Sequence, residues 1–167
     1  LPYPLHSFLY GEDPASWHLA FDRAAHAACI DGKRVGFEPR RLRLLEYRCL
    51  TDAASKADFV SAEDAIATLR MRKDANELLA MRKAAGIAQS AMQAVLPFIK
   101  VGITERQIAA ELTLQLLRNG SDTEVPFAPI VSGGPNSANP HATPTDRPLA
   151  EGDLLVIDWG ASYQGYF

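Results

Sequence analysis

Apolar and polar residues between positions 74 and 119 recur with the period of two helices that face a core. Asp74 followed by Glu77 is a capping box, and it predicts a helix that begins there and runs to about Pro97. Within this segment apolar residues fall three or four positions apart, the spacing of one helix face. The predicted core-facing residues are Leu78, Met81, Ala85, Ala88, Met92, Val95 and Leu96.

A second helix is predicted over residues 104–119. Thr104 and Gln107 form another capping box, and the Asn-Gly pair that ends at Gly120 is typical of a helix end. Its predicted core face carries Ile108, Leu112 and Leu116. Two antiparallel helices would therefore precede a segment richer in strands.

The first seventy residues alternate between helix and strand patterns. Asp13-Pro14 is a typical helix start, in which the Asp caps and the Pro lies in the first turn. The predicted elements are a helix over 14–29, a strand over 33–37, a helix over 39–50 and a strand over 58–60. This alternation indicates an α/β unit. We place the boundary between two domains, 1–71 and 72–167, just before the capping box at Asp74.

The apolar run at residues 154–157 predicts a buried strand that ends at Asp158. A charge that enters a buried strand costs several kcal/mol, roughly, unless an opposite charge meets it. No Lys or Arg follows Arg147 in the chain. The sequence therefore predicts a metal ion as the partner of Asp158.

Composition narrows the classes of function. Hydrophobic residues make up 47% of the chain and charged residues 22%, which is typical of folded domains. A net charge of −3 gives no reason to expect nucleic acid or an anionic membrane as a partner, and no apolar stretch approaches a membrane span. Cys29 and Cys49 lack metal-site spacing and predict free thiols in a cytoplasmic protein.

His141 lies between two prolines, in Asn139-Pro140-His141-Ala142-Thr143-Pro144, where the prolines stiffen a loop. From these residues alone, a solvated loop histidine is the simplest interpretation. The other histidines, His6, His18 and His26, are interpreted as ordinary surface residues. The glycine-rich stretch at 132–136 lacks the Lys and the following helix of a phosphate-binding loop, so we expect it to shape an active site instead.

Six pieces of the last forty residues together carry a family resemblance. They are Phe127, Ile130-Val131-Ser132-Gly133, His141-Ala142-x-Pro144, Gly152-Asp153, Ile157-Asp158-x-Gly160-Ala161 and Tyr163-x-Gly165-Tyr166. In this order they resemble the first half of the catalytic domain of the pita-bread metallopeptidases, which include Xaa-Pro dipeptidase, aminopeptidase P, creatinase and, more distantly, methionine aminopeptidase. Residues 1–71 resemble the latter part of the α/β domain that precedes it.

The resemblance implies a centre of two divalent ions, manganese or alternatively cobalt or zinc, with five protein ligands. Asp158 matches the first ligand, and a second Asp would fall at position 169, so the chain resembles a fragment cut within the metal site. A hairpin turn centred between Tyr163 and Gln164 would bring 158 opposite 169. His141 matches a histidine that hydrogen-bonds the substrate or the tetrahedral intermediate without binding metal. With one of five ligands, residues 1–167 alone are expected to be inactive.

The implied function of the intact protein is hydrolysis of Xaa-Pro dipeptides. Two alternatives stay open: an aminopeptidase P that releases the residue before a proline, and a creatinase-like or non-catalytic binding protein of the same fold. The expected setting is a cytoplasmic homodimer that acts on small proline-containing peptides, with no nucleic acid or membrane partner.

Overall fold

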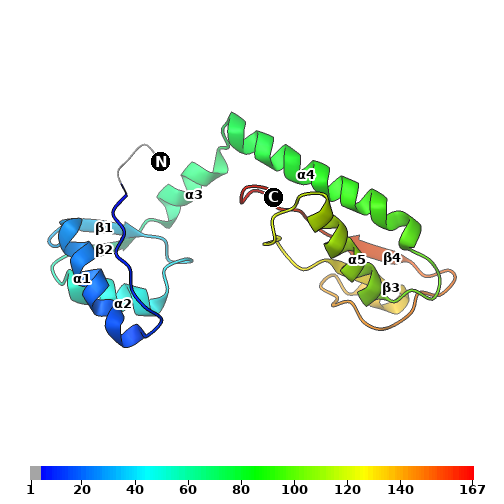
Figure 1. Ribbon diagram of the computed structural model, residues 1–167, viewed down its shortest axis with the longest axis horizontal. Coiled ribbons are helices and arrows are strands. Elements are labelled where there is room, and N and C mark those ends of the chain that lie inside the picture. Colours follow the sequence, from blue (N-terminus) through cyan, green and yellow to red (C-terminus); the bar gives the residue numbers. More distant parts are fainter. Residues whose placement is uncertain (1–4) are drawn as a thin grey trace. The chain divides into compact units, whose positions relative to one another are not determined.

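The computed structural model describes residues 5–167, and the chain divides into two compact units, Leu1–Arg72 and Lys73–Phe167 (Figure 1). Each unit mixes helices and strands, as the sequence predicts: an alternation in the first unit, and two long helices followed by strands in the second. The assignment of the first unit to the latter part of an amino-terminal domain stays a prediction.

The first unit contains a βαβ arrangement. Strands β1 (Arg34–Phe37) and β2 (Asp58–Ser61) pair in parallel, with helix α2 (Leu44–Ala53) between them in the chain. Helices α1 (Trp17–Ala27) and α3 (Glu63–Met71) flank this arrangement in sequence, and a short 3-10 turn, η1 (Pro14–Ser16), precedes α1. The α/β pattern expected for this region is therefore present.

Helix α2 begins five residues later than the predicted start at residue 39. The backbone N–H groups of Arg41 and Leu42 both donate to the Glu38 carbonyl, so this stretch forms a turn. The helix starts only after Arg43, whose N–H donates to the Glu46 carboxylate at 3.0 Å. The spacing of apolar residues does not distinguish this turn from the first turn of a helix.

The second unit has two helices and a two-stranded antiparallel sheet. Its elements are α4 (Ala75–Val95), η2 (Leu96–Phe98), α5 (Glu105–Arg118), β3 (Ile130–Gly133), η3 (Gly134–Ala138) and β4 (Leu155–Asp158). Both predicted capping boxes are confirmed. The Asp74 carboxylate accepts from the N–H groups of Asn76 and Glu77, and Thr104 accepts from Gln107.

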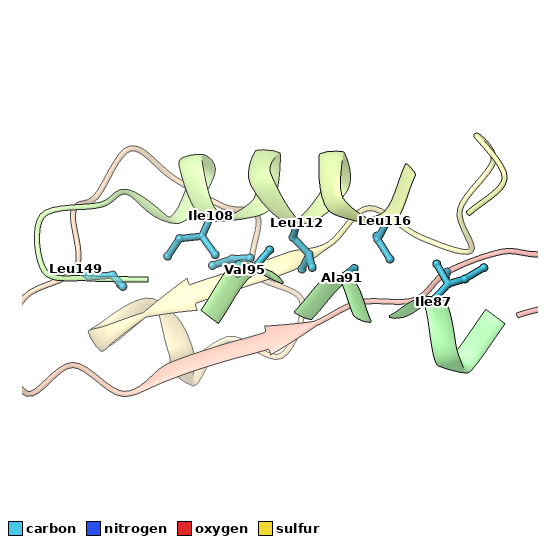
Figure 2. Close-up of a cluster of buried hydrophobic side chains, with 9 residues drawn as sticks. Ile87, Ala91, Val95, Ile108, Leu112, Leu116 and Leu149 are labelled. Atoms are coloured by element: carbon cyan, nitrogen blue, oxygen red, sulfur yellow. The ribbon is translucent and has the colours of Figure 1, made fainter. Parts of the chain in front are cut away.

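The core of this unit lies between the helices and the sheet, and Figure 2 shows the side chains of α4 and α5 that meet there. The predicted face of α5 is confirmed, since all three of its residues are fully buried. The predicted face of α4 is confirmed only in part: Val95 is buried and Ala88 and Met92 pack against the core, but Leu78 is 43% and Leu96 57% exposed. The fully buried residues of the helix are Ala80, Ala84, Ile87, Ala91 and Val95. Apolar residues surround α4, and its small alanines allow close packing, so periodicity alone did not locate the whole buried stripe.

Helices α4 and α5 share a core with one face of the sheet. Val131 of β3 is buried in the helical core, where Ile157 and Leu155 of β4 also pack. Because side chains alternate along a strand, Val156 and Asp158 lie on the other face, and Val156 is 40% exposed. The expected buried strand is therefore wrong, because β4 is half-buried on one face and exposed on the other, where Asp158 lies.

The turn after β4 lies one position later than predicted. Tyr163 and Tyr166 exchange backbone hydrogen bonds at 2.8 and 3.1 Å, so the turn is centred between Gln164 and Gly165. Both central residues have positive φ, 52° and 77°, as a type I′ turn requires. Unbroken pairing from this turn would bring position 158 opposite 171 instead of 169. The hairpin argument for the second ligand position is therefore wrong.

Candidate functional site

A buried carboxylate lies at the beginning of α5, and the sequence pattern did not single it out. Glu105 is fully buried, and its side chain accepts four hydrogen bonds. Oε1 accepts from the Gly133 N–H at 2.7 Å, whereas Oε2 accepts from Asn136 Nδ2 at 2.9 Å and from the N–H and hydroxyl of Thr145 at 2.9 and 2.7 Å. One side chain therefore joins the start of a helix to two distant points of the chain.

These hydrogen bonds keep the Glu105 carboxylate ionised. Burial by itself raises the pKa of Glu105, but the hydrogen bonds from Gly133, Thr145 and Asn136 favour the charged form and outweigh it. The pKa of Glu105 therefore lies below its usual value. Its place in the first turn of α5 adds the favourable field of the helix N-terminus.

A second anchor lies beside it, between Arg147 and Asp153. The guanidinium donates to both carboxylate oxygens, with Nη1 at 2.7 Å from Oδ2 and Nη2 at 3.0 Å from Oδ1. Arg147 and the Ala150 N–H together hold the pKa of Asp153 below its usual value. Gly134 packs closely against this pair, at φ 52°. A side chain would not fit there, because an added Cβ would lie 2.6 Å from Asp153 Oδ1. Arg147 is thus already paired.

His141 lies in the loop between these anchors, residues 134–144, which we call the His141 loop. Its backbone N–H donates to Asn139 Oδ1 at 3.1 Å, and the Ala142 N–H donates to the Asn139 carbonyl at 3.2 Å. Ala142 is buried, whereas His141 is exposed. Its imidazole has no hydrogen-bond partner in the part of the chain that the structure describes. The ring is therefore accessible to a ligand, although its backbone is tied.

Asp158 lies at the end of β4, opposite Ile130 of β3, and is exposed. Its carboxylate makes no hydrogen bond or ion pair within residues 5–167, to His141 or to any other residue. On the same sheet face lies Ser132, whose fully buried hydroxyl has no hydrogen-bond partner among the described residues. Carboxylate oxygens are ligands that suit hard divalent cations such as Mg²⁺, Ca²⁺ and Mn²⁺.

The described residues contain no group of three or more His, Cys, Asp or Glu side chains that could hold a metal ion. Asp158 therefore fits the chemistry of a metal ligand but supplies only one of the several oxygens that such an ion needs. His6, His18 and His26 are exposed, as expected of surface histidines. Both cysteines are free thiols, as predicted.

Comparison with known proteins decides the family. Residues 79–167, more than half of the chain, match the sequence profile of metallopeptidase family M24. This chain belongs to metallopeptidase family M24. The resemblance drawn from the six ordered pieces is confirmed, and an M24 peptidase is a hydrolase that works with divalent metal ions.

Three relatives illustrate the match. An uncharacterized peptidase of Bacillus subtilis, YqhT, is 34% identical over 134 residues, 80% of this chain and 38% of the relative. An Xaa-Pro dipeptidase of Pyrococcus horikoshii is 34% identical over 125 residues, 73% of this chain and 35% of the relative. The structure of an X-Pro aminopeptidase from Thermotoga maritima aligns with a TM-score of 0.77 at 29% identity, covering 93% of this chain and 42% of that one.

The M24 chain thus spans about two fifths of the length of these relatives. Its mixed helix and strand arrangement matches part of the pita-bread fold, as predicted.

No helix among residues 5–167 is long and apolar enough to cross a membrane.

Sequence reasoning missed Glu105 and the pairing of Arg147 with Asp153. An acid directly after the cap of a helix is common, because it suits the helix dipole, and so it did not signal burial. In the sequence, Asp153 stands out only as part of the Gly152-Asp153 pair. The partners of these side chains could not be read from local sequence, since Glu105 binds residues 28, 31 and 40 positions away.

Proposed function

We propose that the intact protein hydrolyses the peptide bond of Xaa-Pro dipeptides. The observation that carries the proposal is membership of the M24 family together with an Xaa-Pro dipeptidase that matches 73% of the chain. Relatives named as Xaa-Pro dipeptidases also come from Pyrococcus furiosus and Lactobacillus delbrueckii, at 36% and 31% identity.

A second candidate is an aminopeptidase that releases the residue before a proline. It is favoured by the likeness to the Thermotoga maritima X-Pro aminopeptidase, which covers 93% of the chain. A probable Xaa-Pro aminopeptidase of Verticillium alfalfae is also 30% identical over 166 residues. Both candidates cleave beside proline and differ in the length of the peptide they accept.

Asp158 is the metal ligand of this proposal. Its carboxylate is exposed and unpaired in the described chain, so binding a cation breaks no ion pair there. With Asp158 as one of their ligands, the two divalent ions that we expect, manganese in the first place, would supply a water of lowered pKa and a Lewis acid for the scissile carbonyl. The remaining ligands and the proton-transferring Glu that the family resemblance implies have no candidates among the described residues.

His141 is the substrate-contacting residue of this proposal. Its imidazole is exposed on a loop whose backbone is held by the Asn139 side chain. A ring N–H at this place can donate a hydrogen bond to the oxyanion that forms when water attacks the peptide carbonyl. Such a donor acts on the reacting atoms without being a metal ligand, and its loss typically costs on the order of a hundredfold in kcat.

The experiment is a substrate comparison with the intact protein after chelation and readdition of manganese, cobalt or zinc. We expect Ala-Pro to be hydrolysed with manganese present, Ala-Ala to be a poor substrate and creatine to be untouched. Faster release of alanine from Ala-Pro-Ala than from Ala-Pro would favour the aminopeptidase. Full activity in excess chelator, or hydrolysis of creatine, would contradict the proposal.

We also infer a cytoplasmic homodimer as the form that acts. The free thiols of Cys29 and Cys49 support a reducing compartment. For residues 1–167 alone we propose weak metal binding and no turnover, because Asp158 is the single ligand candidate among the described residues. Calorimetric titration with manganese tests this, and tight binding of two ions would show that the ligand assignment is wrong.

A further inference from the structure

The two ends of the His141 loop are tied to one side chain. Gly133 precedes the loop and Thr145 follows it, and both donate their backbone N–H groups to the Glu105 carboxylate, at 2.7 and 2.9 Å. Asn136, within the loop, donates its side-chain amide to the same group at 2.9 Å. The carboxylate of Glu105 therefore closes the base of the loop that carries His141.

The backbone at the start of α5 reinforces this connection. The Glu105 N–H donates to the Arg147 carbonyl at 3.3 Å, and the Arg106 N–H donates to the Thr145 carbonyl at 3.1 Å. These N–H groups lie in the first turn of the helix, where they have no partner within the helix itself. One turn further, Ile108 is fully buried in the core. The loop is thus fastened to an element that cannot shift without disturbing the core.

Four donors converge on the carboxylate, and this requires an acceptor on both oxygens. An ionised carboxylate only accepts hydrogen bonds, whereas an amide of the same shape carries one acceptor and one donor. In Glu105→Gln, the amide NH₂ would face either the Gly133 N–H or the three donors at Oε2. The Thr145 hydroxyl can rotate to accept instead, but the backbone N–H groups cannot. The isosteric substitution therefore breaks the connection at one end of the loop.

The backbone of Gly133 also lies unusually close to the side chains of Leu149 and Glu105. A Cβ at this position would lie 2.5 Å from Leu149 Cδ2 and 3.7 Å from Glu105 Oε1. Because buried Leu149 leaves no room, only glycine brings its N–H to the carboxylate without displacing the core.

We propose that Glu105 is a positioning residue that fixes the His141 loop and, through it, the place of the His141 imidazole. It acts through hydrogen bonds to the backbone on both sides of the loop and does not contact the substrate. The part of this inference that concerns turnover rests on the proposed function, whereas the part that concerns the loop does not.

The first measurement is hydrogen exchange of the intact protein, with Glu105→Gln compared with Glu111→Gln. Glu111 lies on the same helix, and within residues 5–167 its carboxylate accepts from Gln115 alone, so it is a matched control. We expect at least tenfold faster exchange in residues 133–145 of Glu105→Gln, unchanged exchange in the middle of α4, and no change in the control. Unchanged exchange at 133–145 would overturn the proposal.

The second measurement is a double-mutant cycle on kcat with His141→Ala. If Glu105 acts by positioning His141, then Glu105→Gln lowers kcat at least tenfold with little change in KM or metal content. In the His141→Ala background the same change should cost less than threefold. A full and independent loss in that background would show that Glu105 does not act through His141, and would overturn the proposal.

The two measurements distinguish a failure of the proposed function from a failure of the positioning role of Glu105. If the wild-type protein does not cleave Xaa-Pro bonds, the proposed function fails, and the exchange measurement alone decides whether Glu105 fixes the loop. If Glu105→Gln does not fold, Thr145→Val removes one of the four donors and keeps the backbone N–H. We then expect a smaller increase in exchange over 133–145, and no increase would overturn the proposal.

Discussion

Glu105 and Asp158 are both acids at the end of a regular element, yet their surroundings are opposite. Glu105, at the start of α5, is fully buried, and four donors occupy its carboxylate. Asp158, at the end of β4, is exposed and has no partner in the described chain. A carboxylate whose lone pairs are used by the protein has a structural role, whereas one left open is available to a ligand. The comparison therefore assigns Glu105 a structural role and leaves the Asp158 carboxylate as the one that we propose to bind metal.

The largest effect on stability should come from Glu105→Ala. This change leaves buried donors of Gly133 and Thr145 without an acceptor, so we expect a loss on the order of 3 kcal/mol in the free energy of unfolding. Urea unfolding of the intact protein measures it, with Glu111→Ala as the control. A loss no greater than that of the control would remove the structural half of the comparison.

Asp158→Asn should have the opposite effect, a small change in stability and a large loss of metal binding and activity. Because this carboxylate supports no other side chain in the described structure, we expect unfolding to change by less than about 0.5 kcal/mol, as for ordinary surface substitutions. Metal affinity should fall, since the substitution removes the charge of the metal ligand that we propose, and most of the activity should be lost with it. Metal analysis and turnover check this. Unchanged metal content and turnover would make Asp158 an ordinary exposed acid.

The smallest effect should be a change in stability at low pH that depends on Glu105. Its pKa in the folded protein lies below the unfolded value, so its contribution is present above about pH 4.5 and is lost as the pH falls through the folded pKa. Arg147, which faces Glu105, stays charged throughout this range. We expect the stability difference between wild type and Glu105→Gln to shrink as the pH falls below about 4.5. A difference that is constant from pH 7 to pH 3 would contradict the prediction.

Much of the helical structure was predictable because its signals are local. The capping boxes at Asp74 and Thr104 bind within three residues of themselves, and the α5 face follows from three large apolar residues at regular spacing. The α4 face was predicted only in part, because alanines rather than the leucines at its two ends belong to its buried stripe. Choosing among apolar faces requires knowing which neighbour each one meets.

The sequence by itself determined the family, the two capped helices of the second unit, and the position of Asp158 at a strand end and of His141 in a proline-flanked loop. Only the tertiary structure decided that Glu105 is buried, that Arg147 is paired with Asp153, and that the last turn is centred after Gln164. The physical reason is the range of the interactions. Caps and periodic faces depend on neighbours a few residues away, whereas the Glu105 carboxylate depends on donors 28 to 40 residues along the chain, brought to it only by folding.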